Sequence, residues 1–266
     1  MNVYTWEMKR NIKTTIVWMV ALVLVQLMYI SVYPSMVKDT ELLTRMMKLM
    51  PKAFLRIFGL EDLDFSNILN YQASISSIYV TLVGSIFAVL LTCKVLAKEE
   101  SEKTAEFLLS KPVKRSNVLL QKISSTLTLI LTFDLVICVS SLLMVEFFKQ
   151  GAVDYTRFWL FWLSQILLHL TVANLVFTII VLAKRQDSTT SFSIGMTFVL
   201  YILAMASKLT EKLELLKYLT PFYYSEGIRI VKYGRMEPVF LVIYFFLNLA
   251  VVLSSLFFYS KKDIYL

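Results

Sequence analysis

The sequence predicts an all-α membrane protein with six transmembrane helices. Hydrophobic residues make up 58% of the 266 residues, and charged residues make up only 17%. A soluble domain of ordinary composition has about 45–50% apolar and about 25% charged residues. The mean hydropathy is +0.68, and the apolar residues gather in separate long runs. This distribution favours helices that cross a bilayer over one large soluble core.

Six apolar runs have the length that a bilayer crossing requires, which is about 20 residues of helix. The fifth run is the most polar, because serine, glycine and threonine dilute it. No repeat or low-complexity tract divides the chain, so residues 1–266 are expected to form a single transmembrane domain. The expected spans are residues 15–33, 74–95, 124–145, 158–183, 190–207 and 239–259.

The charge distribution predicts the orientation. The net charge of +8 could indicate nucleic-acid binding, but in a membrane protein it reflects the enrichment of Lys and Arg on the cytoplasmic side. Many basic residues lie in short segments next to span ends. These segments include the two termini and the stretch around residues 98–115. We therefore expect these parts in the cytoplasm. The polar N-terminal segment lacks a small-residue cleavage site, so the first span is expected to be retained.

Two loops on the opposite side have helical character. Residues 34–73 contain leucine and methionine at helical spacing, with Pro51 suited to a helix start and Gly59 to a helix stop. Residues 211–238 are similarly amphipathic, with Pro221 and Gly234 among their breakers. We expect short interfacial or partly re-entrant helices that cap this side. Ordinary loops with local helix are the alternative.

The segment "KEESEKTAEFLLSKPVKR", residues 98–115, interrupts the apolar runs with charge. Acidic residues lie in its first turn, where they favour a helix, and Pro112 prevents continuation. A helix over residues 99–110 is therefore expected. A helix this short is marginal in water, and its apolar tip needs a surface to dock on. That surface is either a partner protein or the membrane interface.

This segment closely resembles the cytosolic motif of type-2 ABC exporter permeases, the membrane subunits of ATP-binding-cassette transporters. "YPSM", "MPKAFLRIFGLEDLDF", "LKYLTPFYY" and the C-terminal "KKDI" are also similar to the branch of this family that carries "EKTAEFLLSKPVxR". The resemblance covers nearly the whole chain. The residues that fill the cytosolic motif are Glu99, Glu100, Lys103, Thr104, Glu106, Leu108, Leu109, Pro112, Val113 and Arg115.

The resemblance implies a permease subunit that exports a substrate with ATP hydrolysed on a separate P-loop ATPase chain. ATP and Mg would bind that partner, because this chain has no GxxxxGK[ST] motif. The segment would be a cytosolic coupling helix, with Phe107 and Leu108 as an apolar plug and Glu99, Glu100 and Arg115 at its rim. Residues 1–13 would form an amphipathic interfacial helix. A second permease copy or a paralogue, and a bacterial plasma membrane, are also implied.

Polar residues inside the predicted spans form a second group of candidates: Asp134, Gln165, His169, Asn174 and Asn248. Asp134 and His169 lie near the middle of consecutive spans, so they are expected at matching depth and within reach of each other, directly or through Gln165 or Asn174. Ionisable residues are costly in a bilayer and face the protein interior. They are either structural contacts between helices or a substrate- or proton-linked site.

Two other classes of protein compete with the permease. Intramembrane proteases with an EExxxR motif need an arginine where Thr104 stands, and they need more histidines than His169 alone. A membrane sensor or immunity protein that docks an ATPase without moving a substrate would share every feature above. Cys93 and Cys138 have no CxxC or histidine spacing, so they are expected to be packing residues with no metal or disulfide.

Overall fold

The structure, a computed structural model, describes residues 2–38, 45, 47, 49–61, 63–96, 115–183 and 188–261, and within these ranges all side chains except those of 115, 116 and 255–261. All regular elements in these ranges are helical, which confirms the predicted all-α class. They are α1 (Val3–Lys38), α3 (Lys52–Ile57), α4 (Ile68–Ile78), the π-helix η1 (Tyr79–Val83), α5 (Gly84–Leu96), α8 (Arg115–Phe148), α9 (Tyr155–Leu182), α10 (Thr189–Ala206), the 3-10 helix η2 (Glu211–Leu219), α11 (Pro221–Tyr224), α12 (Gly227–Tyr233) and α13 (Pro238–Lys261).

Five helices of the described chain are long and apolar enough to cross a membrane. They are α1, the continuous helix Ile68–Leu96 made of α4, η1 and α5, the Asn117–Phe148 part of α8, α9 and α10. The sixth predicted run forms α13, whose described apolar part, Pro238–Ser254, is shorter. The chain is therefore a multi-pass membrane protein.

The predicted interfacial helix at residues 1–13 does not exist as a separate element. Residues from Val3 onward belong to α1, a single helix of 36 residues. At about 1.5 Å per residue it is about 54 Å long, well beyond the about 30 Å of a hydrocarbon core. One face stays buried over most of its length, from Val3 through Asn11 and Leu22 to Tyr33. This face packs against α8 and, at Tyr33, against Tyr71 of α4, and this packing explains why the helix does not break.

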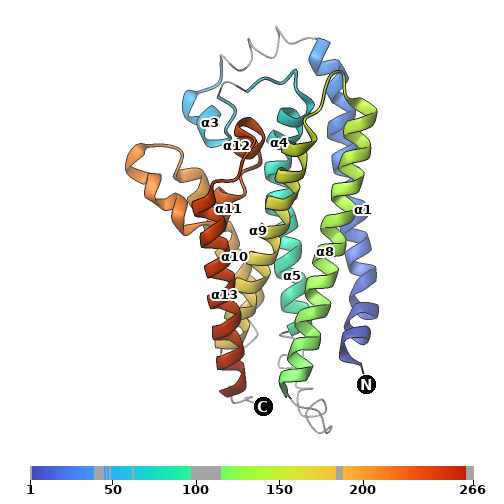
Figure 1. The fold of residues 1–266 in the computed structure, drawn as a ribbon, viewed down its shortest axis with the longest axis vertical. Helices are drawn as coiled ribbons and strands as arrows, with labels where there is room; N and C mark the ends of the chain where they lie inside the picture. Colours follow the sequence, from blue (N-terminus) through green and yellow to red (C-terminus); the bar gives the residue numbers. More distant parts are fainter. Residues whose placement is uncertain are drawn as a thin grey trace.

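Helix α9 is the centre of the bundle. It contacts α5, α8, α10, α12 and α13, and its buried residues run from Phe158 to Val181. Figure 1 shows α1 and α8 side by side along one flank and α13 along the other, with α9 between them. Polar side chains on α9 can therefore reach most of the other long helices.

The two ends of the bundle differ. One end, called the terminal end below, holds the start of α1, the end of α5, the start of α8 and the end of α13 (Figure 1). The opposite end, called the cap end, holds α3, α11 and α12. The predicted coupling segment connects α5 to α8 at the terminal end, but its residues 97–114 lie outside the described residues.

Glycines end two of the short helices at the cap end. Gly59 has φ +67° and Gly234 has φ +65°, a conformation that glycine adopts without strain. After α3, the amides of Gly59 and Leu60 donate to the carbonyls of Arg56 and Leu55, the bond pair of a Schellman motif. The predicted stop at Gly59 is confirmed.

The segment between α10 and α13 packs into the bundle. Its members α11 and α12 bury Pro221, Phe222, Ile228 and Val231, and α12 lies against α4 and α9. A Cβ on Gly227 would lie 2.5 Å from the Phe161 ring, so only glycine allows this approach. The structure thus places short helices over the cap end, as expected; the helix expected near residues 41–50 lies mostly outside the described residues.

The bundle predicts which cysteine substitutions a membrane-impermeant maleimide reaches. Asn117 and Gly151 lie at opposite ends of α8, and Glu211 follows α10 at the cap end; all three are exposed. In intact cells we expect labelling of Gly151→Cys and Glu211→Cys, whereas Asn117→Cys reacts only after the cells are opened. The native Cys93 and Cys138 are buried, which keeps the background low. Labelling of Glu211→Cys only in opened cells would show that α10 does not cross.

Candidate intramembrane polar site

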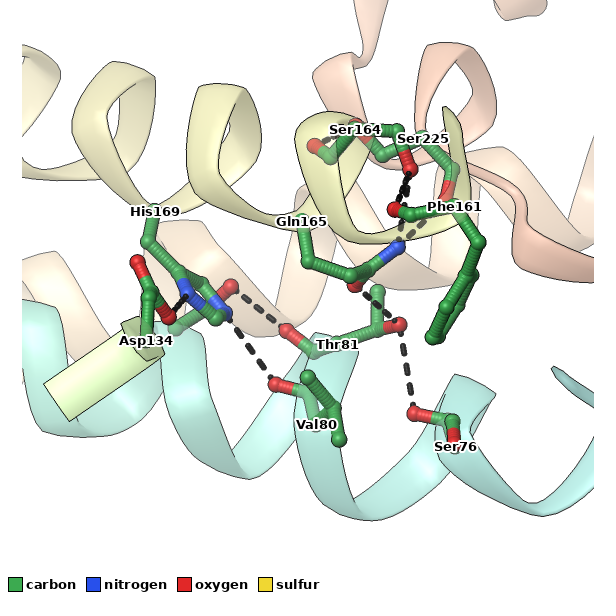
Figure 2. A network of polar contacts seen from close by, with 10 residues as sticks. Ser76, Val80, Thr81, Asp134, Phe161, Ser164, Gln165, His169 and Ser225 are labelled. Carbon is green, nitrogen blue, oxygen red and sulfur yellow. Dashed lines mark hydrogen bonds and ion pairs between the residues drawn. The ribbon is translucent and has the colours of Figure 1, made fainter. Parts of the chain in front are cut away.

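A π-helical turn in the second apolar helix creates the setting of the site. In η1 (Tyr79–Val83) the helix is wound more widely than in α4 and α5 on either side. Such turns are rare and occur mostly as single insertions, often at functional positions. Side chains from the neighbouring α9 contact this turn, as Figure 2 shows.

The first part of the site is a buried pair between Asp134 of α8 and His169 of α9. The His169 Nδ1 atom lies 2.7 Å from Asp134 Oδ1, and the two side chains are 0% and 1% exposed. The other ring nitrogen, Nε2, lies 3.1 Å from the Val80 carbonyl oxygen in η1. His169 therefore connects three helices, and it contacts Asp134 directly, as their matching depth predicted.

The proton positions follow from the chemistry of the acceptors. A carbonyl oxygen can only accept, so His169 Nε2 carries a hydrogen and donates it to Val80. The proton between Nδ1 and Asp134 Oδ1 belongs either to the imidazolium of an ion pair or to a carboxylic acid beside a neutral imidazole. Both arrangements have zero net charge. The pair therefore avoids the cost of an isolated charge inside the bundle.

Gly84 makes room for the histidine. A Cβ at this position would lie 2.7 Å from both Cε1 and Nε2 of His169, a distance at which a neighbouring atom must move. The Gly84 amide also donates to the Val80 carbonyl, so one carbonyl accepts from both the helix and the imidazole. The close approach of α9 to the second helix thus depends on glycine here.

Gln165 forms the second part of the site, one turn of α9 away from His169. Its Oε1 accepts from Thr81 Oγ1 at 2.8 Å, and its Nε2 donates to the Ser225 carbonyl at 2.9 Å. The Thr81 hydroxyl also lies 3.3 Å from the Ser76 carbonyl, and its one hydrogen can serve only one acceptor at a time. Ser225 forms a second hydrogen bond with α9, in which its Oγ donates to the Ser164 carbonyl at 2.9 Å. Gln165 therefore joins η1 to the turn between α11 and α12 (Figure 2).

Asn174 and Asn248 form a separate network between α9 and α13. Asn174 Nδ2 donates to Asn248 Oδ1 at 2.6 Å. Asn248 Nδ2 in turn donates to Thr171 Oγ1 at 2.8 Å and to the Tyr244 carbonyl at 2.8 Å. The predicted polar candidates thus divide into two groups. Asp134, His169 and Gln165 surround η1, and the two asparagines hold α13.

Sequence reasoning missed several members of the site. Thr81 and Ser225 are common polar residues with no distinguishing spacing, and the Val80 carbonyl has no sequence signal. Gly84 had a signal that could have found it, because a glycine inside an apolar run marks a close approach of another helix. Among the described residues, no three His, Cys, Asp or Glu side chains gather as a metal site requires.

The predicted ATPase-coupling residues lie almost entirely outside the described part of the chain. Only Arg115 falls within it, as the first residue of α8, and its side chain is not described. The others are Glu99, Glu100, Thr104, Glu106, Phe107, Leu108, Leu109 and Pro112. Their assignment to coupling remains a prediction.

The fold and the site define a polytopic membrane protein whose long helices are joined by buried polar contacts. Comparison with protein families identifies the class further. Residues 1–263 match the family described as ABC-2 family transporter protein, and the chain belongs to this family. It is accordingly a permease, a transmembrane component of the ABC transporters. Comparison with curated proteins gave no match.

The Asp134–His169 pair predicts a specific double-mutant result. Removing one partner strands the other in a dry site, which costs about 3–5 kcal/mol. We expect Asp134→Ala and His169→Ala each to lower the folded yield and the melting temperature in detergent. The double variant should lose less than the sum, because the second removal strands nothing.

Asn174→Ala combined with Asp134→Ala is the matched control for this cycle. Asn174 lies on the same helix as His169 but belongs to the other network, so its loss should add to that of Asp134→Ala. Additive losses for Asp134→Ala and His169→Ala would show that the two are not energetic partners. If Asp134→Ala and His169→Ala kept the parent's stability but lost transport, the pair would instead belong to the transport path.

Proposed function

We propose that this chain is the membrane-spanning permease subunit of an ABC exporter, in the branch that carries "EKTAEFLLSKPVxR". The observation that carries the proposal is the family match over residues 1–263, nearly the whole chain. The motif in residues 98–115 supports the branch. ATP and Mg would bind a separate ATPase subunit, and this chain would convert the movement of that subunit into movement of its spans.

The position of the motif supports a coupling role. The motif connects Leu96 at the end of α5 to Arg115 at the start of α8. Both ends lie at the terminal end of the bundle, together with the start of α1 (Figure 1). A partner that binds the motif there would act directly on the second and third spans. Rigid elements that pack on a partner are a common way to transmit such movement.

The proposal includes a six-span topology with both termini in the cytoplasm of a bacterial cell. The short α13 would be the sixth span, so α1 and α13 would begin and end on the same side. A half-size permease encloses a path only with a second copy or a paralogue in the plasma membrane. The exposed apolar side chains of α13, among them Phe245 and Phe246, suit lipid or a second permease.

For the polar site we propose a structural role. Asp134, His169 and Gln165 are fully buried. Asp134 and His169 contact each other, and the other hydrogen bonds of His169 and Gln165 go to backbone carbonyls and to the hydroxyls of Thr81 and Ser164. Interhelical polar contacts stabilise membrane bundles, although each contributes only about 0.6–2 kcal/mol. A site that binds and releases a substrate or a proton would need access from one side of the membrane.

Removing the apolar plug tests the proposal. Phe107→Ala with Leu108→Ala should prevent co-purification with the partner ATPase, since an anchor residue contributes about 2 kcal/mol or more, roughly 30-fold in affinity for each. The matched control is Leu215→Ala, which removes an apolar side chain that is 75% exposed in η2, and it should co-purify normally. If the plug variant still co-purifies and transports with ATP hydrolysis, the contact lies elsewhere.

A further inference from the structure

Lys122 is a buried lysine at the terminal end of α8. Its side chain is only 5% exposed, although a lysine near a span end ordinarily extends to water or to lipid headgroups. It lies close to the start of α8 at Arg115, and hence close to the point where the chain enters this helix from residues 97–114. A buried ammonium needs specific partners, because an isolated charge in a dry site is very costly.

The first partner is the end of α5. Lys122 Nζ donates to the Val95 carbonyl at 2.8 Å. Val95 is the last residue but one of α5, so its carbonyl is among those that have no amide partner within the helix. A cation at a helix C-terminus is also favoured by the helix dipole. Lys122 therefore caps α5 immediately before the segment 97–114.

The second partner is the start of α1. Lys122 Nζ lies 3.8 Å from Glu7 Oε1, and the Glu7 side chain is 1% exposed. Asn11 Nδ2 donates to the other carboxylate oxygen, Oε2, at 3.1 Å. The carboxylate is therefore oriented by its own helix and faces α8. One ammonium group thus joins the terminal ends of α1, α5 and α8.

More exposed polar contacts also join α1 to its neighbours at this end. The Tyr4 amide donates to Gln121 Oε1 at 3.3 Å, and Lys94 Nζ donates to Thr14 Oγ1 at 3.2 Å. The first of them pairs the start of α1 with the residue next to Lys122. These contacts are more exposed than those of Lys122 with Val95 and Glu7. Solvent therefore weakens the contacts of the buried ammonium least.

Stability alone does not explain why Glu7 and Lys122 are charged rather than apolar. Replacing a buried ion pair by apolar residues of similar volume often leaves a protein as stable as before or more stable, and the best-attested use of such a pair is to specify one arrangement. Here the arrangement includes both ends of the segment 97–114 and the first turns of α1.

We propose that Lys122 is a positioning residue for energy coupling, which holds the terminal ends of α1, α5 and α8 together so that they move as one unit. The inference rests on the proposed function, and it adds α1 to the parts that the ATPase moves. The long α1, which packs against α8 and also contacts α4, would carry that movement to the cap end.

The experiment measures whether these ends stay together during the ATPase cycle. Asn2 and Ser124 are exposed and line one cleft between α1 and α8. Asn2→Cys and Ser124→Cys, in a chain with Cys93 and Cys138 replaced by alanine, are treated with a short bifunctional thiol reagent. The full chain is studied with its co-purified ATPase in lipid vesicles, without nucleotide and with ATP and vanadate.

We expect the same cross-linking yield in both nucleotide states with Lys122 present. In the neutral double variant Glu7→Gln/Lys122→Met, the melting temperature should stay near that of the parent, because neither residue of the pair is left as a charge without the other. Its cross-linking yield should nevertheless fall at least threefold with ATP and vanadate. Lys13→Met, which removes an exposed lysine of α1, is the matched control and should behave like the parent.

Three results would overturn the inference. The first is a yield that already depends on nucleotide in the parent, since the ends would then separate during the normal cycle. The second is a double variant whose yield is as constant as the parent's. The third is a double variant that no longer folds, which would make the pair a requirement of folding only. Failure of the ATPase to co-purify with the parent would instead contradict the proposed function.

Discussion

The contact of His169 with Asp134 and with the Val80 carbonyl is the constraint on which the arrangement of the bundle depends. An ionisable side chain in the middle of a span costs about 2.5–3.5 kcal/mol on insertion scales, so two of them must be brought together. Their distance of 2.7 Å requires α8 and α9 to touch at this depth. The third contact, to Val80, brings the second apolar helix to the same point.

The π-turn and the glycine after it are consequences of the same contact. Gly84 allows the imidazole to approach the helix axis, and η1 places the Val80 carbonyl and the Thr81 hydroxyl toward α9. The turn also divides the helix into two halves with different neighbours. The half nearer the cap end, α4, packs on α12, and the half nearer the terminal end, α5, packs on α9, α8 and α10. Polar contacts around η1 therefore set how the cap helices sit on the membrane bundle.

Much of this fold could be predicted from the sequence. Length and hydropathy placed every long helix, and Gly59 marked the end of α3, because these signals are local. The continuity of α1 could not be predicted, since it depends on packing against α8 that local polarity does not reveal. Lys122 illustrates the same limit. Its position near a span end indicated a cytoplasmic charge, whereas the fold buries it against Glu7 and Val95.

The candidate site was predictable only in part. Asp134 and His169 stood out because charged residues inside apolar runs are rare, and their pairing followed from the hairpin. The π-turn and the Ser225 carbonyl were missed, because backbone conformation and backbone acceptors have almost no signature in a single sequence. Gly84 was missed although a glycine inside an apolar run can mark a close approach of another helix.

The close approach of α9 to the second helix is tested most directly by a methyl group at Gly84. Gly84→Ala should displace the imidazole and lower the melting temperature in detergent as much as His169→Ala does. Gly195→Ala, where nothing lies within 4 Å of the added carbon, should not, because it only improves the helix propensity of α10. Equal melting temperatures for the two glycine variants would contradict the account.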